Sequence, residues 1–89
     1  MIYELHFVPS AFKEWKKLGE TIQAELKNKL LDRLQNPKVP KDKIRGYENI
    51  YKIKLRTAGY RLIYQVKDTE LIVLVLVVGK MDKYLNKSE

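Results

Sequence analysis

Cationic side chains alternate with apolar ones in the stretch YKIKLR, residues 51–56. In a β-strand this alternation places Lys52, Lys54 and Arg56 on one face. Arg61 belongs to a second alternating stretch, residues 60–67. Cations gathered in this way bind phosphate groups with little regard to base sequence, and salt weakens the interaction. The pattern predicts a phosphate-binding face, with a merely solvated basic surface as the alternative.

RNA supplies its own nucleophile, the ribose 2′-OH, so cleavage needs a base, charge stabilisation at the phosphate and a proton for the leaving 5′ oxygen. Histidine and glutamate commonly transfer these protons, but the cationic strands carry neither and the only histidine is His6. Neighbouring cations disfavour the ammonium form of lysine, so Lys52 or Lys54 could act as the base. Arg61 would stay charged and stabilise the phosphate. Metal-free RNA cleavage is therefore one use of this face.

The net charge of the 89-residue chain is +7, and residues 38–67 account for all of it with nine basic and two acidic side chains. Such clustering is typical of a polyanion-binding surface. The chain has no cysteine and a single histidine, which excludes a disulfide framework and a thiolate metal site. We expect no metal and no cofactor, and we assign His6 a structural role.

The N-terminus lacks a basic leader followed by an apolar segment, and the longest apolar run, residues 71–78, is too short to span a membrane. We therefore expect a cytoplasmic protein without a membrane partner. The length predicts a single domain, residues 1–89, in which residues 81–89 form a mobile tail.

Two helices are predicted to follow a first strand at residues 2–8, which Pro9 ends. Ser10 is the expected N-cap of the first helix and Gly19 its C-cap. Thr21 is the expected cap of the second helix, which ends at residues 36–37. Its core stripe consists of Ile22, Leu26, Leu30 and Leu34.

A basic loop at residues 37–49 precedes the two alternating stretches, which we expect to form a β-hairpin. A two-residue turn at Ala58-Gly59 would place Leu55 opposite Leu62 and Arg56 opposite Arg61. Residues 71–78 are apolar on both faces and predict a central strand. The expected fold is α+β, with an N-terminal strand and a two-helix hairpin packed on one face of a small, mainly antiparallel sheet.

The stretch YKIKLRTAGYRLIYQV at residues 51–66, with KEWKKLG at 13–19 and VGK at 78–80, resembles the RelE toxins of toxin–antitoxin modules. The resemblance covers nearly the whole chain and implies a microbial-ribonuclease-like fold. It also implies translation arrest under stress by metal-independent cleavage of mRNA in the ribosomal A site. The implied partners are a RelB-like antitoxin, the ribosome with its 16S-type rRNA, mRNA, and operator DNA through the antitoxin complex alone.

By position, the resemblance assigns Lys54 to activating the 2′-OH, Lys52 to charge stabilisation and Arg61 to the transition state. Possible substrate-binding residues are Arg45, Arg56, Lys80 and Tyr84. Where the family has an arginine after VGK, this chain has Met81, which neither holds charge nor donates a hydrogen bond. The family's base-stacking tyrosine position reads Lys87, and Tyr84 either replaces it or is an ordinary surface residue.

Two other functions remain open. A catalytically silent protein of the same fold would bind the antitoxin and the ribosome without cutting, as the loss of the arginine at Met81 would allow. A general RNA-binding module ranks last, because we find no exposed aromatic platform in the sequence for stacking bases. The basic loop is a candidate for contact with ribosomal RNA, and a solvated loop is the alternative.

Overall fold

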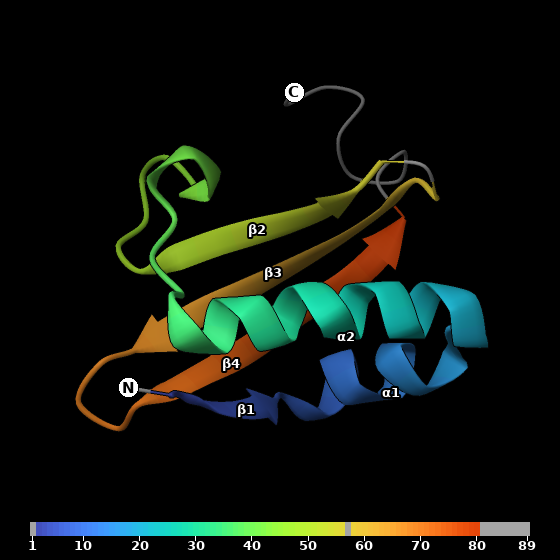
Figure 1. The fold of residues 1–89 in the computed structure, drawn as a ribbon, viewed down its shortest axis with the longest axis horizontal. Coiled ribbons are helices and arrows are strands. Elements are labelled where there is room, and N and C mark those ends of the chain that lie inside the picture. The colour runs from blue at the N-terminus through green and yellow to red at the C-terminus, as the bar shows by residue number, and fades with distance from the viewer. Residues whose placement is uncertain (1, 57, 81–89) are drawn as a thin grey trace.

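The computed structural model describes residues 2–56 and 58–80, which form two helices, a short 3₁₀ helix and four strands (Figure 1). The four strands make one sheet of order β1-β4-β3-β2, in which only β1 runs parallel to its neighbour β4. This arrangement confirms the expected α+β fold and the central place of β4. The elements are β1 (Glu4–Phe7), α1 (Pro9–Lys17), α2 (Glu20–Gln35), η1 (Pro40–Asp42), β2 (Ile50–Leu55), β3 (Tyr60–Lys67) and β4 (Ile72–Lys80).

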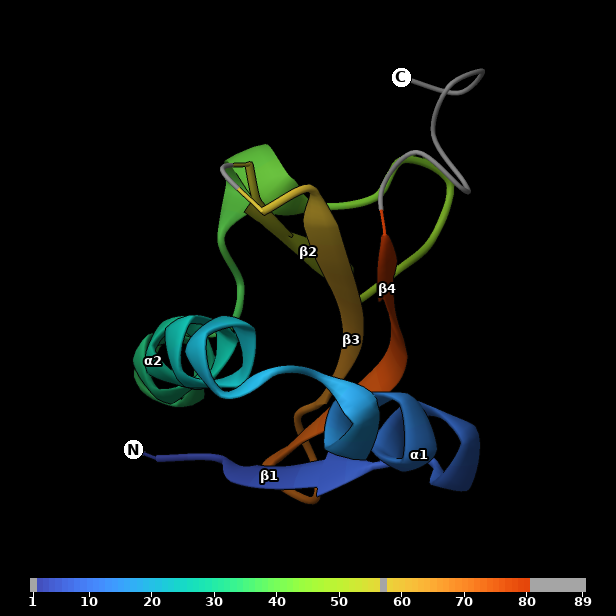
Figure 2. The ribbon, with the colours of Figure 1, turned by 90° about the vertical axis from the view of Figure 1, so that its right-hand side faces the viewer.

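Helix α2 covers one face of the sheet, and α1 lies against β4 and β1 (Figure 2). Leu26 and Leu30 of α2 are fully buried and Leu34 is nearly so. They pack against the inward side chains of β2, β3 and β4, in one continuous core. Burying each leucine stabilises the fold by about 1.5–3 kcal/mol, so this stripe fixes which face of the sheet stays uncovered.

The helix boundaries differ from the expected ones at three positions. Val8, and not Ser10, is the N-cap of α1, because Pro9 occupies the first helical position, where its missing N–H costs nothing. Gly19 is the N-cap of α2 rather than the C-cap of α1, with an extended backbone at φ −64°. Thr21 therefore lies inside α2. The second helix ends at Gln35, as residues 36–37 predict.

The β2–β3 hairpin has a different register from the expected one. Tyr51 lies opposite Tyr64, Ile53 opposite Leu62 and Lys54 opposite Arg61. The predicted two-residue turn and the pairing of Arg56 with Arg61 are wrong, because residues 56–59 together connect the strands. The shift amounts to two residues, which returns every side chain to its expected face.

Strand β4 contains a bulge that changes its alternation. Val75 lies opposite Tyr64 and Val77 opposite Ile63, so Leu76 is an extra residue. Val75 and Val78 are consequently both buried, whereas a regular strand would turn them to opposite faces. Within residues 2–56 and 58–80 no helix is long and apolar enough to cross a membrane.

Candidate nucleic-acid interface

Lys54 and Arg61 form a cationic pair across β2 and β3 on the face of the sheet that α2 leaves uncovered. Side chains directly opposite one another have Cβ atoms about 4.5–5.5 Å apart, where like charges destabilise a sheet. Lys54 is half-buried and Arg61 is only 9% exposed. The structure thus brings together two of the three predicted catalytic side chains.

A glycine and a further lysine lie beside this pair. Gly79 of β4 lies opposite Arg61, and Lys52 is on the same face, opposite Ile63. A glycine inside a strand often marks a place where a ligand or another backbone approaches closely. The outer face therefore presents Lys52, Lys54 and Arg61 beside a position without a side chain, which suits a phosphate of an extended strand.

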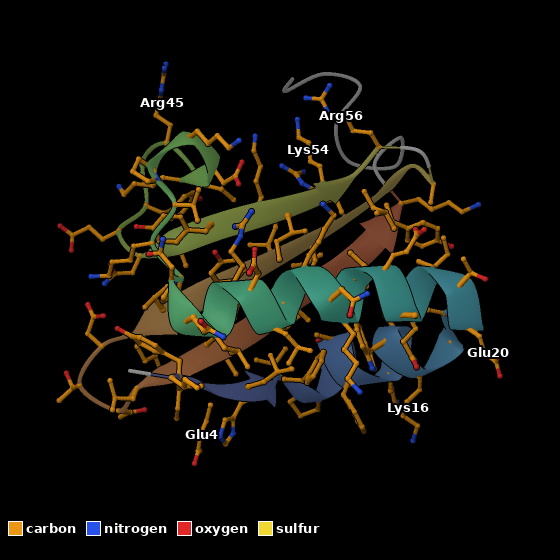
Figure 3. The ribbon with its side chains drawn as sticks, in the orientation of Figure 1. Glu4, Lys16, Glu20, Arg45, Lys54 and Arg56 are labelled. Carbon is orange, nitrogen blue, oxygen red and sulfur yellow. The ribbon has the colours of Figure 1, made fainter. Side chains whose placement is uncertain are left out.

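Arg56 is exposed in the connection between β2 and β3 and is not part of the cross-strand pair. Arg45 is exposed in the basic loop. Figure 3 shows Arg45, Lys54 and Arg56 pointing outwards on the same side of the molecule, away from the helices. These cations extend the cationic face along β2. Lys80 is exposed at the end of β4, while Met81 and Tyr84 lie outside the described residues.

A partly buried polar network connects the basic loop to α2 and the sheet. Arg33 of α2 donates hydrogen bonds to Asp42 in η1 (2.7 Å), to the Tyr64 hydroxyl (2.9 Å) and to the Lys52 carbonyl (3.4 Å). The Tyr64 hydroxyl in turn donates to the Pro37 carbonyl (2.6 Å). These bonds tie the loop, the helix and the strand that carries the lysines into one unit.

The charges in this network shift two pKa values. Burial lowers the pKa of Arg33, but hydrogen bonds and charge from Tyr64 and Asp42 outweigh it, and the net shift is upwards. Burial raises the pKa of Tyr64, against the opposing effect of Arg33. Arg33 therefore stays charged and Tyr64 neutral at physiological pH. Sequence reasoning missed this network, although Arg33 follows Leu30 by three residues and so lies on the buried side of α2.

The remainder of the loop is held against the free edge of β2. Lys43 forms an isolated antiparallel bridge with Tyr51, and the Ile44 amide donates to the Ile50 carbonyl (2.8 Å). At the other end Lys38 donates to Asp68, whose pKa the Lys38 ammonium and the Tyr3 hydroxyl hold below its usual range. The loop is thus held in place at both of its ends.

His6 lies far from the lysines. Its ring is 3.1 Å from the Glu4 carboxylate, and both side chains are exposed on β1. Three inter-strand steps separate β1 from β2, a distance of about 14 Å. This histidine–glutamate pair therefore cannot assist proton transfer at Lys54. Among the described residues, no three histidine, cysteine or acidic side chains gather in a way that could hold a metal ion.

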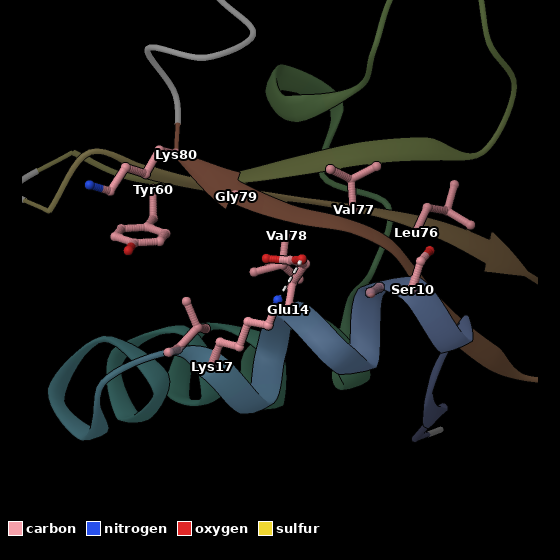
Figure 4. Close-up of a pocket in the computed structure, with 11 residues that line it drawn as sticks. Ser10, Glu14, Lys17, Tyr60, Leu76, Val77, Val78, Gly79 and Lys80 are labelled. Carbon is pink, nitrogen blue, oxygen red and sulfur yellow. Dashed lines mark ion pairs between the residues drawn. The ribbon is translucent and has the colours of Figure 1, made fainter.

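A pocket of about 670 Å³ lies between α1 and the second half of β4 (Figure 4). Its walls include Ser10, Tyr60 and Lys80, and a Glu14–Lys17 ion pair of 3.7 Å spans one turn of α1. Neither Lys54 nor the other predicted catalytic residues line it. An open cationic face suits a long polyanion better than this pocket does, so we place the candidate site on the face.

Comparison with known proteins places the chain among toxins. The profile of the family described as "ParE toxin of type II toxin-antitoxin system, parDE" matches residues 5–84. The "mRNA interferase toxin RelE" of Escherichia coli (strain K12) is 48% identical over 83 residues, which cover 93% of this chain and 87% of that protein.

Solved structures agree with this assignment. The isolated E. coli RelE toxin superposes with a TM-score of 0.86 at 50% identity, covering 88% of this chain and 83% of that one. The intact E. coli RelBE toxin–antitoxin complex gives a TM-score of 0.85 at 50% identity, with 88% and 95% covered. From its profile match, its identity to RelE and its fold, the chain belongs to the RelE/ParE family of toxins of type II toxin–antitoxin systems.

Proposed function

We propose that this chain is a toxin endoribonuclease that cuts mRNA in the ribosomal A site and so inhibits translation. The observation that carries the proposal is the Lys54–Arg61 pair on an uncovered sheet face, in a chain 48% identical to a protein named mRNA interferase. A phosphate bound at this pair would contact two cationic side chains that the strand register places opposite one another, an arrangement that suits an RNA backbone.

The proposed reaction uses the RNA's own hydroxyl. Lys54 takes the proton of the 2′-OH, whose oxygen attacks the adjacent phosphorus. The bond to the 5′ oxygen breaks, that oxygen takes a proton from water, and the products are a 2′,3′-cyclic phosphate and a 5′-hydroxyl. Arg61 and Lys52 stabilise the charge that develops on the phosphate oxygens. No metal ion is needed, because the nucleophile belongs to the substrate.

Position 81 favours a second candidate function. The side chain there is a methionine, and it cannot supply the charge that an arginine would bring to the phosphate and the leaving oxygen. Loss of one such group costs a rate factor on the order of a hundred. The alternative to a slow ribonuclease is a silent protein that binds its antitoxin and the ribosome without cutting.

The proposed partners are the ribosome, through its 16S-type rRNA, and a RelB-like antitoxin. The net charge of +7, all of it in residues 38–67, supports contact with RNA. The antitoxin is proposed from the E. coli RelBE complex, whose toxin shares this fold. Contact with operator DNA is proposed only through that complex.

Primer extension on mRNA in stalled ribosomes tests the ribonuclease proposal. We expect A-site cuts by the unaltered chain and a loss of about a hundred-fold or more in Lys54→Ala. Lys29→Ala removes the same charge from an exposed position on α2 and should cut at the original rate.

Met81→Arg distinguishes the two candidate functions. Faster cutting by this variant would show that the chain is an attenuated ribonuclease. If neither the chain nor Met81→Arg cuts while both bind ribosomes, the ribonuclease proposal fails and the silent binding protein takes its place.

A further inference from the structure

The basic loop displays one tyrosine ring to solvent. Tyr47 is 62% exposed, whereas Tyr51 and Tyr64 are buried in the core. A large aromatic ring in this position contributes little to the stability of the free protein. No exposed aromatic platform was expected from the sequence, and Tyr47 supplies a single exposed ring.

Hydrogen bonds fix the backbone on which this ring stands. The Tyr47 amide donates to the Ile44 carbonyl (3.3 Å), and the Lys43 ammonium donates to the Tyr47 carbonyl (3.1 Å). Gly46 makes the turn before the tyrosine with φ +90°, a conformation that glycine adopts without strain. Because these contacts order the loop before a ligand binds, binding carries little entropic cost for ordering the loop.

Cationic side chains belong to the same loop as the ring. Lys41, Lys43 and Arg45 are exposed in the same loop, and the Lys43 ammonium is held at the Tyr47 carbonyl. Arg45 points outwards on the side of the molecule that also carries Lys54 (Figure 3). Proteins that bind single-stranded nucleic acid combine these two features, a cationic track for the backbone and aromatic rings on which bases stack.

We propose that Tyr47 stacks on an unpaired RNA base while Arg45 and Lys43 bind the phosphates beside it. Tyr47 lies in the loop before β2, whereas Lys54 lies four residues beyond the start of that strand, about 13 Å along it. We therefore assign the stacked base to a position other than the proposed cleavage position. This inference rests on the proposed function and deepens it by assigning a second contact to the RNA.

Binding of a non-cleavable RNA tests the subsite without requiring catalysis. The probe is a fluorescent 2′-O-methyl decanucleotide, and anisotropy at low salt measures its affinity. We expect Tyr47→Ala to bind about ten-fold more weakly, as the loss of one base-stacking contact predicts. Tyr47→Phe keeps the ring and should bind as the unaltered chain does. Phe12→Ala is the matched control, since Phe12 is 46% exposed on α1.

An abasic series provides a second readout that a structural role would not change. Removing the stacked base from the probe should weaken binding to the unaltered chain about as much as Tyr47→Ala does. The two changes together should then cost no more than either alone. Ribosomes with and without mRNA in the A site identify the strand: a Tyr47→Ala defect confined to programmed ribosomes indicates mRNA, and a defect in both indicates ribosomal RNA.

The inference is overturned if Tyr47→Ala binds the probe as tightly as the unaltered chain, or if the unaltered chain does not bind it. It is also overturned if Tyr47→Phe loses as much as Tyr47→Ala, or if Tyr47→Ala weakens only antitoxin binding. If the unaltered chain cuts mRNA on ribosomes but Tyr47→Ala does not change probe binding, the subsite is refuted and the proposed function is not. If Tyr47→Ala weakens probe binding but no variant cuts mRNA, the ribonuclease proposal is refuted and the subsite is not.

Discussion

Replacing Tyr64 with phenylalanine removes one buried hydroxyl and nearly preserves the shape of the core. That hydroxyl donates to the Pro37 carbonyl (2.6 Å) and accepts from Arg33 (2.9 Å). A neutral hydrogen bond contributes about 0.5–1.5 kcal/mol and one to a charged group about 1.5–3 kcal/mol. Arg33 keeps its ion pair with Asp42, so we expect a loss of about 2 kcal/mol rather than the full sum.

Urea denaturation followed by circular dichroism measures this loss. With a slope of about 1–3 kcal/mol per molar urea, the midpoint should fall by about 1 M while the slope stays unchanged. Thermal unfolding should shift downwards by about 4–8 °C for each kcal/mol lost. Tyr47→Phe is the matched control, because its hydroxyl belongs to a residue that is 62% exposed, and it should stay within about 0.5 kcal/mol of the unaltered chain.

A loss below about 0.5 kcal/mol in Tyr64→Phe would refute the reasoning. It would show that the two hydrogen bonds of the Tyr64 hydroxyl contribute no net stability. A changed slope would instead show that the denatured or native state had changed in compactness.

Two further predictions concern the ends of the basic loop. The Lys38 ammonium and the Tyr3 hydroxyl hold the pKa of Asp68 below its usual range. These contacts therefore stabilise the fold at pH values above the pKa of Asp68 in the unfolded chain, and the stabilisation is lost as the pH falls through the pKa of Asp68 in the folded protein. Asp68→Asn should therefore flatten the fall in melting temperature between about pH 5 and pH 2, and an unchanged acid profile would contradict this. Gly46→Ala should lower the free energy of unfolding by about 1–2 kcal/mol, measured by urea denaturation, because φ is +90° at this residue. The added Cβ would meet nothing within 4 Å, so the loss would come from the backbone conformation alone. An unchanged free energy of unfolding would show that the turn relaxes.

The alternating stretches were sufficient to predict which side chains share a face. Lys52, Lys54 and Arg61 lie on the uncovered side, as the sequence predicted, since alternation in a strand is a local property. The helix stripe and the central apolar strand were predicted for the same reason. The cap positions at Ser10 and Gly19 were not, because a proline at the first helical position changes where the helix begins.

The cross-strand partner of Arg61 depended on the tertiary structure. An alternating sequence fits equally well when the register shifts by two residues, and only the length of the 56–59 connection makes Lys54 the partner instead of Arg56. Family resemblance supplied roles for these residues, and the structure supplied their neighbours.

By itself, the sequence determined the elements, their buried faces and the cationic side of the sheet, because periodicity and charge act between near neighbours in the chain. Only the tertiary structure decided that Arg33 reaches η1 and Tyr64, and that Tyr47 stands exposed beside Arg45. Those outcomes depend on how α2, the basic loop and β2 pack together. Contacts between segments far apart in the chain leave no local pattern from which they can be read.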